Sequence, residues 1–273
     1  MRITVIVDNH ASGDLLAEHG LALWIEARGR RVLFDTGAGR ALAPNARALK
    51  IDLRAADTVV LSHGHYDHGG GLPAVLRSRP GPEVYAHPAA AQPRYAVEGG
   101  RARFIGLPTE SAAAQARVPE EKLHWVAQPV GLGPGIGLTG CVPRETGYED
   151  TGGPFFLDRG GQRPDPLEDD MAMWVATARG LVVCVGCSHA GIVNTLRHAL
   201  KLSGADRLRA VLGGFHLMGA GEERLERTLR DLKALKPGRV APCHCTGDEA
   251  ARRLKDTFGK RYIAAAAGTR LAF

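Results

Sequence analysis

Three histidines and one aspartate fall within six positions of the segment Leu61-Ser62-His63-Gly64-His65-Tyr66-Asp67-His68-Gly69-Gly70-Gly71. The apolar run Thr58-Val59-Val60-Leu61 at its start predicts a short buried strand. Glycines within and after this cluster allow the backbone to turn sharply where side chains must converge. Neutral imidazole and carboxylate groups are typical ligands of zinc, manganese and iron. The segment therefore predicts a metal site at the end of a strand.

Composition narrows the class of protein. The chain of 273 residues is long enough to bury a sizeable core, and its net charge of +6 comes from separate arginines and lysines rather than basic tracts. This charge weakly favours an anionic substrate, while the aromatic content of 5% argues against a nucleic-acid surface. Five cysteines are too few for a disulfide framework, and no segment approaches the ~18 apolar residues that span a bilayer. We expect a soluble, cytoplasmic protein without a membrane partner, and its oligomeric state stays open.

The pattern H-x-H-x-D-H between a hydrophobic strand and a glycine-rich turn resembles the signature of the metallo-β-lactamase superfamily. The resemblance extends to Leu33-Phe34-Asp35-Thr36-Gly37, which is similar to the strand-ending D-T-G of that superfamily. It implies a four-layer αββα sandwich, with two mixed sheets face to face and helices outside, as a single domain over residues 1–273. It also implies that Asp35 is a structural group that orients metal-bound histidines, a role that carboxylates commonly fill.

Hydrophobic patterns predict two hairpins, one over residues 21–34 and one over 172–185. Helical spacing follows at 40–49, 192–200, 225–232 and 248–258. Residues 93–170 are the least regular part of the chain, and we expect them to form a lid or insert that selects the substrate. Arg144 or Arg163 in this region could contact a phosphate, although ordinary surface charge is the simpler interpretation.

Histidines follow four predicted strands in the same way. One strand leads into His63, His65, Asp67 and His68, and later strands lead into His189, His216 and His244. Loops at the carboxyl ends of strands gather at one edge of an α/β sheet, where ligands bind. The repeated arrangement therefore predicts one shared site.

A catalytic zinc ion takes three protein ligands and keeps one position for water. We assign His63, His65 and His189 to one ion. We assign Asp67, His68 and His244 to a second. Asp67 would also orient the attacking water or accept its proton, so it counts as a catalytic residue as well as a ligand.

Two departures from the superfamily pattern leave the number of ions open. The usual middle histidine has no counterpart in Thr139-Gly140-Cys141-Val142-Pro143, and Gly186-Cys187 stands where Gly-Asp is usual. His189 or the Cys187 thiolate would replace the missing ligand. Without a bridging carboxylate, a site with a single ion remains an alternative to a binuclear one.

His216 matches no ligand position of the superfamily, so we expect it to contact substrate or to support another side chain. Cys243 and Cys245 alternate with His244. On an extended backbone this alternation points both thiols away from the histidine. We therefore expect both to be buried small hydrophobic residues.

The stretches G-C-S-H-A-G-I, G-G-F-H-L and P-x-H-C-T-G narrow the resemblance to the branch of the superfamily that contains dihydropterin-methyl ribofuranosylaminobenzene-phosphate synthase. This resemblance implies a metal-dependent hydrolase-type enzyme for a small anionic substrate, phosphorylated or pterin-like. Zinc is the expected metal, with manganese or iron as alternatives. A non-catalytic, metal-containing ligand-binding or sensor module and a metallo-nuclease are the other functions that remain open.

Overall fold

The computed structural model describes residues 1–77 and 81–273, and these form two compact units. Unit 1 comprises Met1–Val126, Gly153–Asp169 and Ala266–Phe273. Unit 2 comprises Ala127–Gly152 and Asp170–Ala265. The expectation that residues 1–273 act as a single domain stays a prediction.

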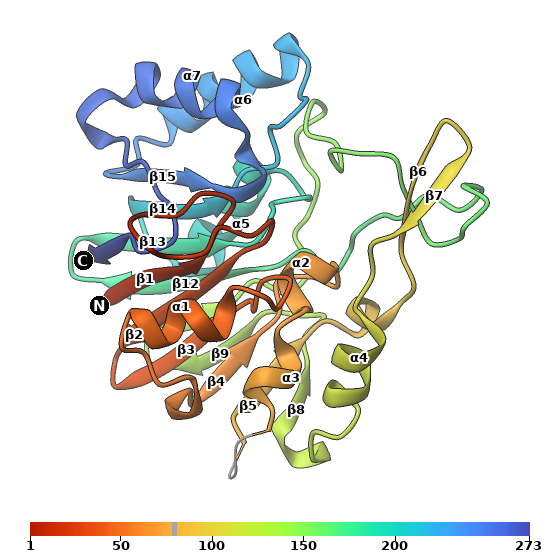
Figure 1. Cartoon of the computed structure of the whole chain (residues 1–273). Helices are drawn as coiled ribbons and strands as arrows, with labels where there is room; N and C mark the ends of the chain where they lie inside the picture. Colours follow the sequence, from red (N-terminus) through yellow and green to blue (C-terminus); the bar gives the residue numbers. More distant parts are fainter. Residues whose placement is uncertain (78–80) are drawn as a thin grey trace. The chain divides into compact units, whose positions relative to one another are not determined.

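Unit 1 contains a mixed sheet of seven strands in the order β16-β1-β2-β3-β4-β5-β8 (Figure 1). Neighbours from β16 to β3 pair antiparallel, and neighbours from β3 to β8 pair parallel. A smaller sheet has the order β11-β6-β7. The strands of unit 1 are β1 (Arg2–Val7), β2 (Ala22–Ala27), β3 (Arg30–Phe34), β4 (Thr58–Val60), β5 (Glu83–Ala86), β6 (Tyr95–Glu98), β7 (Arg101–Phe104), β8 (Leu123–Trp125), β11 (Phe155–Phe156) and β16 (Arg270–Ala272).

Short helices cover the larger sheet of unit 1, and its core is apolar. Side chains of β1 to β5 pack with those of α1 and α3 in one buried cluster that includes Leu33, Leu42, Val59 and Leu72. The predicted hairpin over residues 21–34 is confirmed as β2 and β3. The helices of unit 1 are α1 (Leu42–Ala48), η1 (Leu53–Ala55), α2 (Tyr66–Gly69), α3 (Leu72–Val75), η2 (Pro88–Ala91), α4 (Thr109–Gln115) and η3 (Glu120–Lys122).

The region 93–170 has more regular structure than its sequence suggests. It contains the hairpin β6-β7, helix α4 and further short strands in both units. The hairpin turns at Gly99 and Gly100, which have φ of 54° and 75°. Two successive residues with positive φ are the requirement of a type I′ hairpin turn, so Gly-Gly was a usable signal for this hairpin.

Unit 2 contains a mixed sheet of six strands in the order β15-β14-β13-β12-β10-β9 (Figure 1). Strands β13, β14 and β15 are parallel neighbours, so their carboxyl ends lie at the same edge. The predicted hairpin over residues 172–185 is confirmed as β12 and β13. The strands are β9 (Val130–Gly133), β10 (Ile136–Leu138), β12 (Ala172–Thr177), β13 (Gly180–Val185), β14 (Leu208–Gly214) and β15 (Val240–Cys243).

Three amphipathic helices supply the core of unit 2. Leu196, Leu229 and Leu254, one from each helix, belong to a buried cluster with Val183 and Val211 of the sheet. The predicted helices at 192–200, 225–232 and 248–258 are thereby confirmed. The helices of unit 2 are α5 (Ile192–Ser203), α6 (Glu222–Ala234), η4 (His244–Thr246), α7 (Asp248–Phe258) and η5 (Gly259–Arg261).

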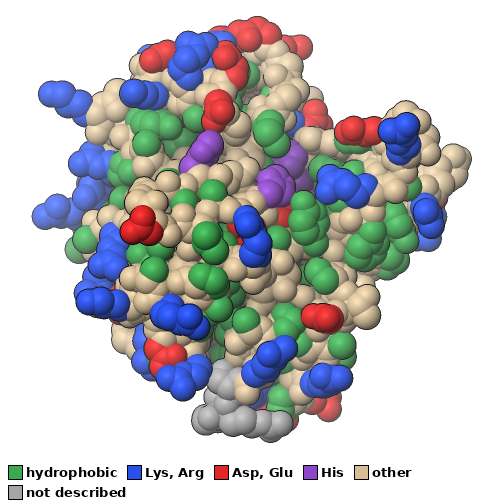
Figure 2. Space-filling model, in the orientation of Figure 1, with side chains coloured by type: hydrophobic (Ala, Val, Ile, Leu, Met, Phe, Trp, Pro, Cys, Tyr) green, Lys and Arg blue, Asp and Glu red, His purple; other side chains and the backbone are tan. Residues whose placement is uncertain are grey.

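The surface carries scattered charge. Figure 2 shows lysine and arginine side chains spread over the face that it draws, with acidic side chains between them. Among the helices of the described residues, none is long and apolar enough to cross a membrane.

Candidate metal centre

The structure brings the four candidate residues of unit 1 together. Strand β4 ends at Val60, and the chain turns through His63 and His65 into the short helix α2, which carries Asp67 and His68. All four side chains are buried. The ring of His63 lies 4.6 Å from that of His65 and 4.2 Å from that of His68, measured between centroids.

Asp35 orients this group of side chains, as expected. It follows β3, is fully buried, and has a φ of 60°, a strained value for a residue other than glycine. Its carboxylate accepts hydrogen bonds from Nδ1 of His68 at 2.7 Å and from the backbone N–H and the hydroxyl of Ser62, each at 2.7 Å. The Ser62 hydroxyl also lies 2.8 Å from Nδ1 of His63.

This network determines which ring nitrogens can bind a metal. A carboxylate only accepts, so Nδ1 of His68 donates and its Nε2 carries the lone pair. The Ser62 hydroxyl gives its single proton to Asp35, so Nδ1 of His63 must donate to Ser62. Nε2 of His63 therefore also carries a lone pair, which is the form of imidazole that ligates metals.

The donor atoms of these four side chains lie close together in two pairs. Nε2 of His63 lies 3.0 Å from Nδ1 of His65. Two ligands on a tetrahedral zinc with bonds of about 2.0–2.1 Å are separated by roughly 3.3 Å. Since Nε2 of His63 carries a lone pair, Nδ1 of His65 donates to it here and would give up this proton when the pair binds an ion. Nε2 of His68 lies 3.9 Å from Oδ2 of Asp67. In the predicted assignment these two atoms would bind the second ion.

His19 is a further neighbour of the site. It lies in the loop after β1, and its Nε2 is 3.2 Å from Oδ2 of Asp67. Its side chain is 49% exposed. From the sequence, His10 and His19 could border the metal pocket, although a loop histidine is more often simply exposed, and the contact with Asp67 agrees with the first interpretation for His19.

In unit 2 the candidate histidines follow three parallel strands. His189 comes after β13, His216 after β14 and His244 after β15. The rings of His189 and His216 lie 4.2 Å apart. Ser188, His216 and His244 have φ of 59°, 47° and 52°, so the backbone is strained at or beside each histidine. Such strain costs on the order of 1–3 kcal/mol per residue and clusters at functional sites.

Hydrogen bonds also determine which ring nitrogen of each of these histidines carries the lone pair. Nδ1 of His189 lies 2.8 Å from the carbonyl oxygen of Thr151, so Nδ1 donates and Nε2 carries the lone pair. In His216 the two nitrogens exchange roles. Its Nε2 lies 3.2 Å from the carbonyl oxygen of Gly152, so Nε2 donates and Nδ1 carries the lone pair. The guanidinium of Arg144 donates to the backbone oxygen of His189 at 2.7 Å. Arg144 therefore supports the histidine loop in this structure.

Cys245 corrects one expectation. Strand β15 ends at Cys243, and His244–Thr246 forms a 3₁₀ turn, so the alternation of an extended strand does not continue. The ligand atoms of Cys187, His216 and Cys245 consequently lie within 4.8 Å of one another. Burial raises the pKa of the Cys245 thiol, but hydrogen bonding with Cys187 and the charges of His244 and His216 bring this pKa well below its ordinary value. Cys245 is buried, as expected, but it faces the polar cluster.

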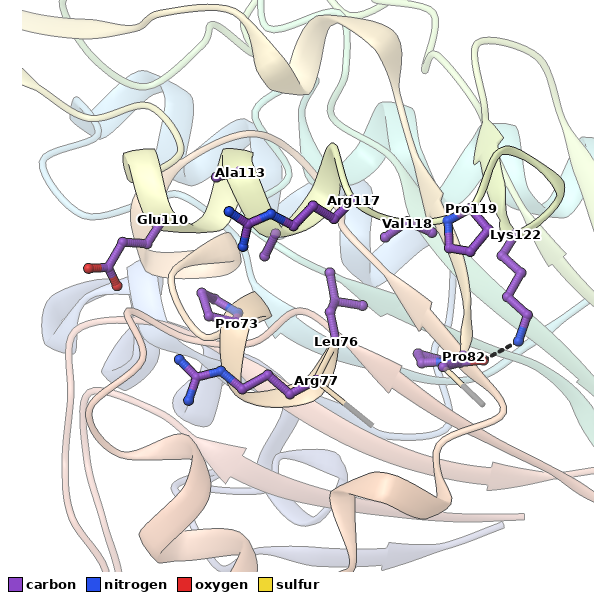
Figure 3. Close-up of a pocket in the computed structure, with 12 residues that line it drawn as sticks. Pro73, Leu76, Arg77, Pro82, Glu110, Ala113, Arg117, Val118, Pro119 and Lys122 are labelled. Atoms are coloured by element: carbon purple, nitrogen blue, oxygen red, sulfur yellow. Dashed lines mark hydrogen bonds between the residues drawn. The ribbon is translucent and has the colours of Figure 1, made fainter. Parts of the chain in front are cut away.

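A separate cavity of about 740 Å³ lies in unit 1 between α3 and α4 (Figure 3). Its apolar lining includes Leu76 and Val118, and its charged lining includes Arg77, Arg117 and Lys122. The Lys122 ammonium donates to the backbone oxygen of Gly81 at 2.6 Å. None of the candidate ligands lines this cavity, so its size does not bear on the metal chemistry.

The family model of the metallo-beta-lactamase superfamily matches residues 16–244. The chain is 29% identical to a 7,8-dihydropterin-6-methyl-4-(beta-D-ribofuranosyl)-aminobenzene-5'-phosphate synthase of Methanocaldococcus jannaschii, over 100% of this chain and 97% of that protein. It is 34% identical to an uncharacterized protein of the same organism, over 92% and 93% of the two chains.

Two solved structures are also similar to this chain. A metal-dependent hydrolase of the beta-lactamase superfamily superimposes with a TM-score of 0.85 and 31% identity, over 100% of this chain and 99% of that one. Zn(2+)-bound PqqB from Methylobacterium extorquens has a TM-score of 0.59 at 12% identity and shares the fold, with complete coverage of both chains. These similarities confirm the predicted α/β fold class of the metallo-β-lactamase type.

Proposed function

Because the chain belongs to the metallo-β-lactamase superfamily, we propose that it is a metal-dependent, hydrolase-type enzyme for a small anionic substrate, phosphorylated or pterin-like. The observation that carries this proposal is the Asp35 network, which directs the lone pairs of His63 and His68 away from their buried hydrogen-bond partners. Such carboxylate-histidine pairs are typical of metal sites. The buried set of imidazole and carboxylate donors fits zinc, with manganese or iron as alternatives.

Six residues are proposed as metal ligands, for one or two ions: His63, His65, Asp67, His68, His189 and His244. The bound metal would supply Lewis-acid chemistry, polarising a phosphoryl or carbonyl oxygen and activating water. Asp67 would orient that water or accept its proton. His216 would contact the substrate, since its ring lies beside that of His189 and its backbone is held in a strained conformation. Cys187 is the alternative ligand to His189, because its thiol lies in the same cluster as His216 and Cys245.

A second candidate function comes from the relative that is named as a pterin-linked phosphate synthase. In that case the same Lewis acid would activate a hydroxyl leaving group on a pterin. A substrate screen separates the two functions. Hydrolysis of a model phosphodiester or thioester supports the first, and condensation of a hydroxymethyl pterin with an aminobenzene ribofuranosyl phosphate supports the second. Metal binding without turnover of either class would favour a sensor module.

Asp35→Asn is expected to weaken zinc binding by about 10-fold to 100-fold, the usual effect of changing a carboxylate behind a metal-bound histidine. The amide cannot accept all three of the hydrogen bonds that Asp35 receives from His68 and Ser62. Competition with a chelator measures the affinity. Asp57→Asn is the control, because Asp57 binds Arg31 at the surface. Equal affinities for the two variants would contradict this role of Asp35.

A further inference from the structure

The acidic segment 164–170 ends in two buried carboxylates, Asp169 and Asp170. Asp169 and Asp170 are 0% and 3% exposed. The chain passes from unit 1 to unit 2 between them. We propose that both are positioning residues, each fixing the backbone next to a histidine of the metal centre. This inference rests on the proposed function.

In unit 1, Oδ2 of Asp169 accepts a hydrogen bond at 2.7 Å from the N–H of Gly64, the residue between His63 and His65. Gly64 is also packed from another direction, because a Cβ there would lie 2.1 Å from the backbone oxygen of Ala90. The two contacts leave the His63-Gly64-His65 backbone little freedom. The spacing of the His63 and His65 donor atoms therefore depends on Asp169.

The buried charge of Asp169 is balanced by Arg94, which is itself 0% exposed. The guanidinium binds both carboxylate oxygens, at 2.6 Å and 2.7 Å, and its Nε lies 2.9 Å from Oδ2 of Asp165. A bidentate pair of this kind holds a carboxylate in one orientation. Asp169 is thereby presented to Gly64 in a fixed geometry.

In unit 2, Oδ2 of Asp170 accepts a hydrogen bond at 2.8 Å from the N–H of Ala190, which directly follows His189. The turn continues through Gly191, where a Cβ would lie 2.4 Å from the Glu149 carboxylate. That carboxylate accepts the N–H groups of Val193 and Asn194 at the start of α5. The backbone on the carboxyl side of His189 is thus held by two acidic side chains.

The first test compares Asp170→Ala with Asp170→Asn. The amide keeps an oxygen for the Ala190 N–H, so Asp170→Asn should bind zinc as wild type does, whereas Asp170→Ala should bind about 10-fold to 100-fold more weakly. In metal-free protein, amide hydrogen exchange of residues 186–191 should be faster in Asp170→Ala only. Asp170→Val replaces Asp170→Ala if the latter does not fold.

Asp158→Ala is the matched control. The Asp158 carboxylate also accepts backbone N–H groups, from Gly160, Gln162 and Arg163, but no candidate ligand adjoins them. Its zinc affinity should equal that of wild type. Zinc binding and exchange that are unchanged in Asp170→Ala, or an equal loss of affinity in Asp158→Ala, would overturn the proposal. A wild-type chain that binds no metal would instead refute the proposed function, and the exchange measurement would still decide the positioning role.

The test of Asp169 compares Arg94→Ala with the double variant Arg94→Ala/Asp169→Ala. In both, the ion pair between Arg94 and Asp169 is absent. Removing Asp169 as well relieves an uncompensated buried charge, so the double variant should be at least as stable as Arg94→Ala. It should nevertheless bind zinc about 10-fold to 100-fold more weakly, because Gly64 loses its acceptor. A purely structural role would change stability and affinity in the same direction, and that result would refute positioning by Asp169.

Discussion

His65→Ala is expected to lose bound metal and, with it, all activity above background toward a model phosphodiester or thioester. Nδ1 of His65 lies 3.0 Å from Nε2 of His63. The variant therefore keeps only one of these two ring nitrogens as a metal ligand. A catalytic zinc ion is held by only three protein ligands, and removing one leaves too few to retain it. Elemental analysis and an initial-rate assay of the same preparation measure both effects.

The control for this variant is His124→Ala. His124 is also in unit 1, but it binds Glu83 at 2.6 Å and is partly exposed. Its replacement should leave metal content and activity unchanged. Retained activity in a metal-free His65→Ala protein would contradict the proposed chemistry, whereas retained metal would remove His65 from the set of ligands.

Arg94→Ala is expected to lower the free energy of unfolding by about 3–5 kcal/mol, the cost of breaking a buried ion pair by removing one partner. Asp169 is fully buried and Asp165 nearly so, and Arg94 contacts both carboxylates. Burial already raises the pKa of Asp165, against the opposing influence of Arg94. Chemical denaturation of wild type and variant gives the difference.

Arg31→Ala provides the comparison for this effect. Arg31 pairs with Asp57, but the two side chains are 47% and 36% exposed. Exposed pairs contribute about 0–1 kcal/mol, so the free energy of unfolding should fall by no more than this. Equal changes for the Arg31 and Arg94 variants would show that the buried network does not stabilise the fold.

Local sequence signals were sufficient to predict much of the fold and the positions of the histidines at strand ends. The hairpins β2-β3 and β12-β13 follow from alternating hydrophobic runs around short polar turns. The histidine segment was recognisable because ligand-type side chains recur within a few positions after a strand. Asp35 was identified through the family resemblance, and its contacts with Ser62 and His68 agree with the expected role.

Contacts whose partners are distant in the chain could not be predicted from the sequence. The acidic stretch near Asp169 gave no sign of its burial, because carboxylates are rarely buried unless they are paired. Its partner Arg94 lies 75 positions away, and no local pattern connects them. Cys245 was misplaced for a different reason, since a strand was extended through a 3₁₀ turn that begins at His244. Neither hydrophobic periodicity nor residue spacing marks that change.

The proposed function requires that this chain holds metal through its histidine loops. The most direct test is the metal content per chain of wild type and His189→Ala, purified without added metal and then supplied with zinc, manganese or iron. We expect one or two ions per chain in wild type and at least one fewer in His189→Ala. An unchanged metal content in the variant would transfer the role of His189 to Cys187, and a wild-type chain that binds none of the three metals would contradict the proposed metal centre.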